Sequence, residues 1–244
     1  MSKKSRGNEV LFMKLAIMQP YFLPYLGYWQ MLNAVDRFIL YDDVNYIKNG
    51  WINRNNLLDN GKAHLFTLML DGASSFKLIN ETHINGTVEA RNKVSSYIKN
   101  AYRKAPYFKT VFPMIEAIIN FPETNIALLL ENHFRVIADY LQISTEIVVS
   151  SHIEKDCSLK AQDKVLDICK RQGAETYINA IGGTELYSRE DFAAQGIKLQ
   201  FIKMQPIEYT QFKNEFVPNL SILDIMMFND VEKINGYLNN YELC

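Results

Sequence analysis

The stretch that decides the fold runs over residues 14–43 and reads KLAIMQPYFLPYLGYWQMLNAVDRFILYDD. It begins with an apolar run, Lys14–Met18, that is ended by a Gln-Pro pair, and such a run predicts a buried strand. Apolar residues at helical spacing follow at 29–35, and a second apolar run at 37–41 predicts another strand. A strand, loop, helix and strand within about 30 residues are typical of a βαβ unit. The stretch therefore predicts parallel strands joined by a right-handed crossover.

The same alternation returns in the C-terminal half of the chain. Strands are expected at 146–151, 176–183 and 197–204, and helices at 160–174, 221–228 and 231–238. Between the two halves, residues 88–141 carry helical periodicity. We therefore predict one α/β domain over residues 13–244, with a parallel-type sheet, flanking helices, a helical insertion at about 88–141 and a nucleotide-binding-like architecture.

Other segments lack this regular pattern. Residues 1–12 have a basic start without the apolar core of a secretory signal, so we predict a flexible extension. Residues 44–62 are polar and aromatic and are predicted to form a loop, followed by a strand at 64–70. Residues 71–86 are rich in Gly, Ser and Asn, which predicts either a mobile lid or a local hairpin.

Composition excludes several classes of protein. The net charge of −1 argues against general nucleic-acid binding, although it leaves room for a local basic patch. No apolar run approaches the roughly 20 residues that a membrane-spanning helix needs. The cysteines Cys157, Cys169 and Cys244 are odd in number and have no close pair, so neither a disulfide framework nor a zinc knuckle is predicted. The cytoplasm is the expected location, and the sequence identifies neither a cofactor nor an oligomeric state.

Polar loops follow each expected strand of the sheet. In open parallel sheets ligands bind beyond the carboxyl ends of the strands, so these loops should converge on one site. They are Gln19–Gly27, Asp42-Asp43, Ser150-Ser151, Asn179–Gly183 and Pro206–Gln211. Neighbouring residues of a strand point to opposite faces, so only one of the two aspartates should face the site, where it could hold a ribose hydroxyl, an ammonium or a metal ion. The alternative is that the aspartates cap the following turn.

A second polar cluster, Trp51, Asn53, Arg54 and Asn55, lies in the predicted loop. The Arg54 guanidinium suits a phosphate or carboxylate, and asparagine amides suit sugar hydroxyls. The alternative is a solvated loop with turn-forming asparagines. The diglycine Gly182-Gly183 would let backbone N–H groups approach a phosphate.

Aromatic residues and histidines complete the candidates. The loop after the first strand contains Tyr21, Phe22, Tyr25, Tyr28 and Trp29, which could stack on a base or sugar ring or could form a hydrophobic lid. The four histidines are dispersed and lack the spacing of metal ligands, so no metal site is predicted. His133 lies in an apolar helical pattern and is expected in the core. His152, beside the predicted cleft, is the histidine we select as a candidate general base.

Several separated motifs together resemble the WbqC-like protein family. They are KLAIMQPYFLPYLGYWQMLNAVDRFILYDDVNYIKNGWINRN at 14–55, NAYRKAPYF at 100–108, VVSS at 148–151, GAETYINAIGGTELY at 173–187 and FVPNLSILDIMMFN at 216–229. The resemblance implies an association with O-antigen, lipopolysaccharide and other surface-polysaccharide gene sets, and an enzyme that acts on sugar nucleotides or their amino-sugar derivatives. It also implies site-lining or site-shaping positions, which are Gln19, Pro20, Gly27, Asp43, Asn53, Arg54, Asn55, Ser151, Gly182 and Tyr187.

A fainter likeness concerns the segment Tyr25-Leu26-Gly27-Tyr28, which is similar to the HxGH loop of nucleotidylyltransferases. Both histidine positions are tyrosine here, and this puts nucleotidyl transfer in doubt while leaving a nucleotide-binding architecture in place.

We therefore expect transfer of a small acyl or aminoacyl group to a nucleotide-linked amino sugar. The alternatives are a nucleotidylyltransferase-like enzyme and a non-catalytic sugar-nucleotide-binding or scaffolding subunit. The expected catalytic residues are Asp43 and His152. The expected substrate contacts are Gln19, Tyr25, Gly27, Asp42, Trp51, Asn53, Arg54, Asn55, Ser150, Ser151, Asn179, Gly182, Gly183 and Tyr187.

Overall fold

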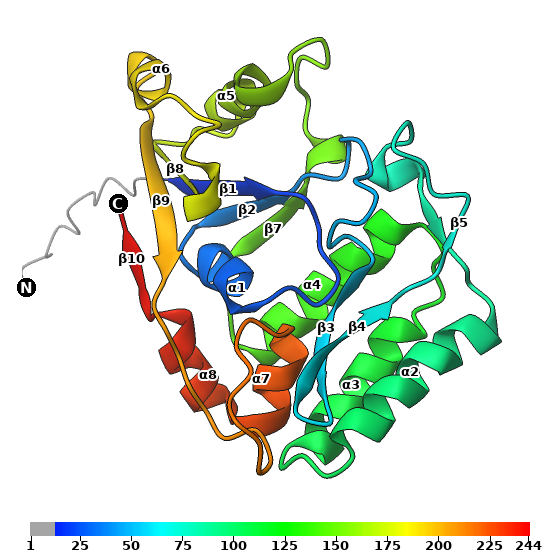
Figure 1. Cartoon of the computed structure of the whole chain (residues 1–244). Coiled ribbons are helices and arrows are strands. Elements are labelled where there is room, and N and C mark those ends of the chain that lie inside the picture. Colours follow the sequence, from blue (N-terminus) through cyan, green and yellow to red (C-terminus); the bar gives the residue numbers. More distant parts are fainter. Residues whose placement is uncertain (1–12) are drawn as a thin grey trace, which may run out of the picture.

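A computed structural model describes residues 13–244, so the extension predicted at 1–12 lies outside the described residues (Figure 1). Its centre is a six-stranded sheet in the order β10-β9-β8-β1-β2-β7. The strands are β1 (Lys14–Met18), β2 (Arg37–Leu40), β7 (Glu146–Val149), β8 (Thr176–Ala180), β9 (Lys198–Met204) and β10 (Tyr241–Leu243). All neighbouring pairs are parallel except β9 with β10. The predicted parallel α/β sheet is confirmed.

The strand order is that of a doubly wound fold. The chain moves outward from β1 to β2 and β7, then crosses to β8 on the other side of β1 and continues to β9. The direction of winding thus reverses between β1 and β8. Ligands of such sheets bind at this switch point, outside the carboxyl ends of the strands.

Helices cover both faces of the sheet, because alternate residues of each strand point to opposite faces. Leu15 and Ile17 of β1 belong to the core with Val165 and Phe192, whereas Ala16 belongs to the larger core on the other face. Figure 1 shows α5 (Ala161–Arg171) and α6 (Arg189–Ala194) above the sheet and α1 (Leu26–Asn33), α7 (Ile222–Phe228) and α8 (Val231–Leu238) below it.

The predicted helical insertion is confirmed by α2 (Val88–Tyr102), α3 (Phe108–Ile119) and α4 (Ile126–Tyr140). These helices lie beside a separate two-stranded hairpin of β3 (Arg54–Asp59) and β4 (Lys62–Thr67) (Figure 1). Within the described residues, no helix has the length and apolar character needed to cross a membrane.

The prediction of a loop over 44–62 was wrong in its second part, because β3 begins at Arg54. The strand was hidden by its two asparagines, which are poor strand formers. Its turn does carry a signal: Asn60 and Gly61 have φ values of 49° and 73°, as a two-residue hairpin turn requires. The short strand β10 was also not predicted.

The segment 71–86 has a local hairpin arrangement. Its ends form β5 (Leu70–Asp71) and β6 (His83–Ile84), which pair antiparallel, and a short 3₁₀ turn covers Ile79–Glu81. Whether the segment acts as a lid stays a prediction.

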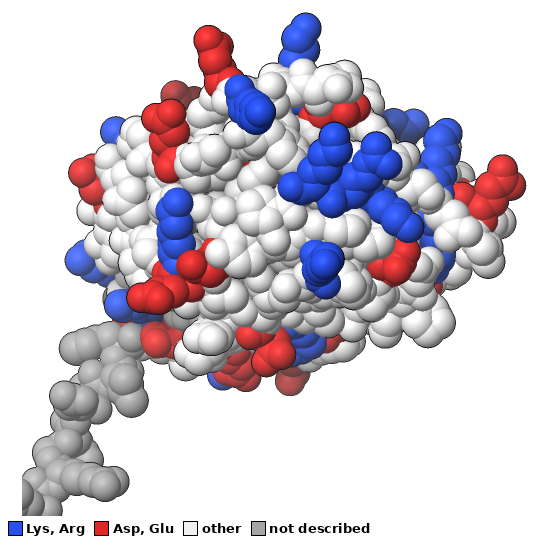
Figure 2. Space-filling model, turned by 90° about the horizontal axis from the view of Figure 1, so that it is seen from below, with Lys and Arg blue, Asp and Glu red and all other residues white. Residues whose placement is uncertain are grey.

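Basic side chains gather locally although the net charge is only −1. Figure 2 shows a group of lysine and arginine side chains on the face seen from below. A polar hollow near the β3–β4 turn and the end of α2 is lined by Arg103, Lys104 and Lys213.

Candidate functional site

The carboxyl ends of three adjacent strands bring predicted site residues together. The Tyr41 N–H donates to the Met18 carbonyl at 2.8 Å, and Val149 pairs with Leu40. Gln19, the Tyr41–Asp43 segment and Ser150 therefore follow β1, β2 and β7 side by side.

Asp42 and Asp43 face opposite sides of the sheet edge, as strand alternation predicts. The buried Asp42 carboxylate accepts the Ser151 N–H at 2.8 Å, the Ser151 Oγ–H at 2.6 Å and the Asn80 amide at 3.3 Å. Two of these bonds tie the end of β2 to Ser151 after β7, and the third ties it to the 3₁₀ turn at Ile79–Glu81. Asp42 and Ser151 thus shape the edge.

Asp43 lies on the α5 side and meets two lysines. Its Oδ2 is 2.9 Å from Lys155 Nζ and 3.4 Å from Lys164 Nζ, and the Lys155 side chain is only 2% exposed. The Lys155 ammonium also donates to the Ser150 carbonyl. Lys164 lies 5.3 Å from the centre of the Tyr41 ring. Two ammonium groups thus face one carboxylate in a largely buried cluster, which we call the lysine cluster (Asp43, Lys155 and Lys164).

The lysine cluster determines the charge of Asp43. Burial raises the pKa of this carboxyl, but the neighbouring Ser150 hydroxyl and the two ammonium groups outweigh burial and hold the pKa below its usual value. Asp43 is therefore ionised at neutral pH. Its negative charge is already matched by two ammonium groups, so the cluster as a whole is net positive, and the lowered pKa makes the carboxylate a weak base.

Unpartnered oxygens mark the same edge. Gln19 Oε1, Asp43 Oδ1 and Ser150 Oγ are buried and have no hydrogen-bond partner of good geometry among the described residues. Buried polar atoms are normally paired, because leaving one unpaired costs about 1–3 kcal/mol. Of these, Gln19 Oε1 is available to a bound polar group or to water, whereas the Ser150 hydroxyl already acts on the Asp43 carboxylate and lowers its pKa.

The loop after β1 has strained backbone that the surrounding structure holds in place. Leu23 has a φ of 47°, which is uncommon for a bulky residue. Its N–H donates to His133 Nε2 at 3.2 Å, and its carbonyl accepts the Asn55 amide and the Ser221 hydroxyl, each at 2.8 Å. Asn55, predicted as a substrate contact, therefore anchors this loop to β3.

His133 is confirmed as a core residue, since it is fully buried. Burial lowers its pKa from 6.5 to about 3, so the imidazole is neutral at physiological pH. Only the neutral ring can accept the Leu23 N–H through Nε2. The shape of the loop thus depends on this protonation state.

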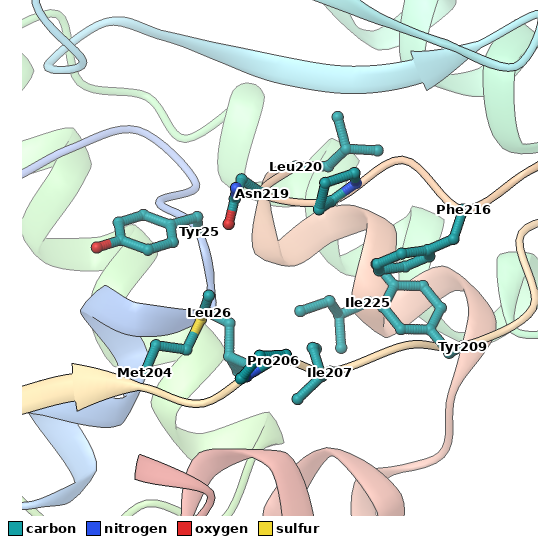
Figure 3. A pocket seen from close by; sticks show the side chains of 11 residues that line it. Tyr25, Leu26, Met204, Pro206, Ile207, Tyr209, Phe216, Asn219, Leu220 and Ile225 are labelled. Carbon is teal, nitrogen blue, oxygen red and sulfur yellow. The ribbon is translucent and has the colours of Figure 1, made fainter. Parts of the chain in front are cut away.

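Two adjoining cavities lie beside the loop after β1. The outer cleft, of about 380 Å³, is lined by Tyr21, Pro24, Tyr25, Trp51, Asn55 and Asn219. The inner pocket, of about 240 Å³, lies between the start of α1, the end of β9 and the segment leading into α7 (Figure 3). Tyr25 and Asn219 line both cavities.

Aromatic rings are open to a ligand in the outer cleft. Tyr25 is 39% exposed and Trp51 is 44% exposed, whereas Phe22, Tyr28 and Trp29 are buried in the core. A Cβ on Gly27 would lie 2.6 Å from the Tyr25 ring, so the missing side chain allows the ring its position.

The first turn of α1 lacks a side-chain cap, although Leu26, Gly27 and Tyr28 are buried and the Tyr28 N–H donates to the Tyr25 carbonyl at 3.1 Å. Tyr25 is its N-cap and makes no side-chain capping bond, and no acidic residue lies in that turn. Free N–H groups at a helix N-terminus attract anions such as phosphate.

Two further residues that were predicted to contact the substrate instead form hydrogen bonds that stabilise loops. Asn53 accepts the Tyr46 hydroxyl and donates to the Leu68 carbonyl, both at 2.8 Å. The Arg54 guanidinium donates to the carbonyls of Asn49 and Gly50.

The residues after β8 are also engaged within the protein. Asn179 donates to Tyr177 Oη at 2.8 Å and accepts the Ala180 N–H at 2.7 Å. A Cβ on Gly183 would lie 3.2 Å from Asn179, whereas Gly182 faces open space. Tyr187 packs against Tyr177, with ring centres 5.6 Å apart.

His152 is exposed and lines a separate hollow with Arg37 and Glu146 beside β7. The structure therefore places it apart from the two cavities. Over residues 13–244, no group of three His, Cys, Asp or Glu side chains is arranged to hold a metal ion.

The sequence did not identify Lys155 or Lys164 as site residues. Lys155 lies in a polar loop, where a lysine is ordinarily solvated, and Lys164 lies in the first part of a helix. The inner pocket was likewise missed, because its apolar lining reads as ordinary core.

Comparison with known proteins gives the chain relatives but no solved structural match. Residues 19–236 match the WbqC-like protein family. A curated relative, the uncharacterized protein Rv1507c of Mycobacterium tuberculosis (strain ATCC 25618 / H37Rv), is 28% identical over 228 residues, which cover 92% of this chain and 97% of the relative. No solved structure is significantly similar to the chain.

Proposed function

The chain belongs to the WbqC-like protein family, and on that premise we propose that it is a cytoplasmic transferase of bacterial surface-polysaccharide biosynthesis. The substrate is a nucleotide-linked amino sugar, which receives a small acyl group. The observation that carries this proposal is the outer cleft, with two open aromatic rings beside an uncapped helix N-terminus.

Each part of the substrate has a complementary group in this arrangement. A base or sugar ring stacks on Trp51 or Tyr25. The diphosphate lies against the first turn of α1, as in other doubly wound folds. Asn219, which lines both cavities, supplies an amide group for the hydroxyl groups of the sugar.

The proposed reaction is acyl transfer from an activated ester or thioester. The amine nitrogen of the sugar attacks the acyl carbonyl carbon and forms a C–N bond. The bond from that carbon to the leaving group breaks, and the leaving group departs with the bonding electrons. The nitrogen loses one proton and the leaving group gains one. The catalytic roles predicted for Asp43 and His152 stay predictions, and the lowered pKa of Asp43 makes its carboxylate a weak base.

The proposal is tested by incubating the purified protein with UDP-linked amino sugars and acyl-coenzyme A thioesters and weighing the products by mass spectrometry. We expect a sugar nucleotide heavier by one acyl group, formed at least tenfold more slowly by a Trp51→Ala variant. His64→Ala on exposed β4 is the matched control and should leave the rate unchanged. Release of pyrophosphate from a nucleoside triphosphate with magnesium, without acylation, would instead support the nucleotidylyltransferase alternative. Binding without any product would favour a non-catalytic subunit.

A further inference from the structure

The inner pocket adjoins the outer cleft, and we infer that it binds the apolar chain of the acyl group that joins the sugar. This inference rests on the proposed function and restricts the acyl group, because it favours a plain acyl chain over an aminoacyl group.

The lining of the pocket is apolar almost throughout. It contains Leu26, Met204, Pro206, Ile207, Phe216, Pro218, Leu220 and Ile225. Its polar side chains are Tyr25 and Asn219, shared with the outer cleft, and Tyr209. No charged side chain lines the pocket. Figure 3 shows these side chains grouped around a common space between β9, the start of α1 and α7.

The buried carboxylate of Asp224, beside the lining residue Ile225, is already engaged. Asp224 is fully buried and follows Leu223 in α7. Its Oδ2 accepts the Tyr209 hydroxyl and the Gln211 amide, both at 2.6 Å, and its Oδ1 accepts the Tyr102 hydroxyl at 2.8 Å. Tyr209 therefore directs its hydroxyl to Asp224 and contributes its ring to the pocket.

This network leaves no partner for a charged ligand group. Burial raises the pKa of Asp224, and the hydrogen bonds from Tyr209, Tyr102 and Gln211 oppose that rise. An aminoacyl ammonium in the pocket would lose its hydration without gaining an ion pair, and such burial is strongly unfavourable. A hydrocarbon chain has no charge whose hydration would be lost, and its transfer from water into the pocket is favourable in free energy.

The inner pocket and the outer cleft lie next to each other and share part of their lining. Tyr25 and Asn219 line both cavities, so the cavities adjoin at these two side chains, and the inference requires the acyl substituent of a sugar in the outer cleft to pass between them. A volume of about 240 Å³ suits a short chain and is too small for a second nucleotide.

The first measurement tests whether the inner pocket by itself binds a short apolar chain. Hexanamide, a neutral amide with a short chain, is titrated into protein with labelled isoleucine methyl groups and followed by NMR. We expect shifts of the Ile207 and Ile225 signals in the wild type, and no shift of the Ile225 signal in an Ile207→Trp variant. The matched control is Ile181→Trp, at an exposed isoleucine outside the pocket, which should bind as the wild type does. Unchanged Ile207 and Ile225 signals in the wild type would overturn the inference.

The second measurement uses ligands that would occupy the outer cleft and the inner pocket together. UDP-glucosamine and its N-acetyl, N-butanoyl and N-glycyl derivatives are titrated by calorimetry. We expect affinity to rise about fourfold for each added methylene, and Ile207→Trp to abolish that rise while binding UDP-glucosamine normally. A flat series, or tighter binding of the N-glycyl compound, would overturn the inference and leave the proposed function standing. If hexanamide shifts the isoleucine signals but no sugar nucleotide binds, the proposed function is contradicted, whereas the apolar character of the inner pocket is not.

Discussion

Replacing Lys155 with methionine is expected to lower the free energy of unfolding by about 3 kcal/mol, because it removes the closer of the two ammonium partners of the buried Asp43 carboxylate. The ammonium of this 2% exposed side chain lies 2.9 Å from Asp43 and also donates to the Ser150 carbonyl. Lys164 remains 3.4 Å from Asp43 in the variant and keeps the loss at the lower end of the range for buried pairs. Urea unfolding followed by circular dichroism measures the change.

A double-mutant cycle separates the ion pair from simple loss of packing. Asp43→Asn in the Lys155→Met background should cost less than Asp43→Asn in the wild type, because the carboxylate has then already lost its closest partner. Arg171→Met is the matched control, since its pair with Asp167 is largely exposed on α5 and should contribute little. A Lys155→Met variant as stable as this control would contradict our description of the lysine cluster.

Acidification should destabilise the protein through His133. Its pKa is about 3 in the folded state, against 6.5 for an ordinary histidine, so the unfolded chain binds more protons between these values. Stability from this residue is therefore complete above pH 6.5 and falls with decreasing pH, by up to about 1.4 kcal/mol per pH unit. The measurement is the free energy of unfolding as a function of pH.

A His133→Gln variant isolates this contribution. The glutamine amide oxygen can still accept the Leu23 N–H but does not titrate. Compared with the wild type, we expect the variant to be less stable at pH 7. Its free energy of unfolding should also change less with pH below pH 6.5, because the carboxylates contribute equally to both proteins. Parallel curves for the two proteins over this range would show that His133 does not carry the dependence.

The sequence predicted the sheet well because its signals are local. The apolar runs of β1 and β2 and the helical periodicity of 88–141 each depend on one short segment. The hairpin was missed because Arg54, Asn55 and Asn56 are unusual strand residues, although the Asn60-Gly61 turn marks it. That 13–244 forms a single domain remains a prediction.

The site was harder to predict, because its contacts join distant segments. Arg54 has the chemistry of a phosphate ligand, yet the fold turns its guanidinium to neighbouring carbonyls. Lys155 and Asp43 are separated by more than a hundred residues and meet only after β7 pairs with β2. Residue chemistry led to the prediction of a site at the carboxyl ends of the strands, and that site stays a prediction. Tertiary structure decides which side chains there remain free to bind.

The most direct test of the proposed site is the fluorescence of its tryptophan. The chain has two tryptophans, of which Trp29 is fully buried and Trp51 is 44% exposed in the outer cleft. We predict that a UDP-, dTDP- or GDP-linked sugar quenches the emission saturably, and that a Trp51→Phe variant, which keeps the Trp29 signal, shows no quenching. Absence of quenching by all three in the wild type, or equal quenching in the variant, would contradict the assignment of the outer cleft as the sugar-nucleotide site.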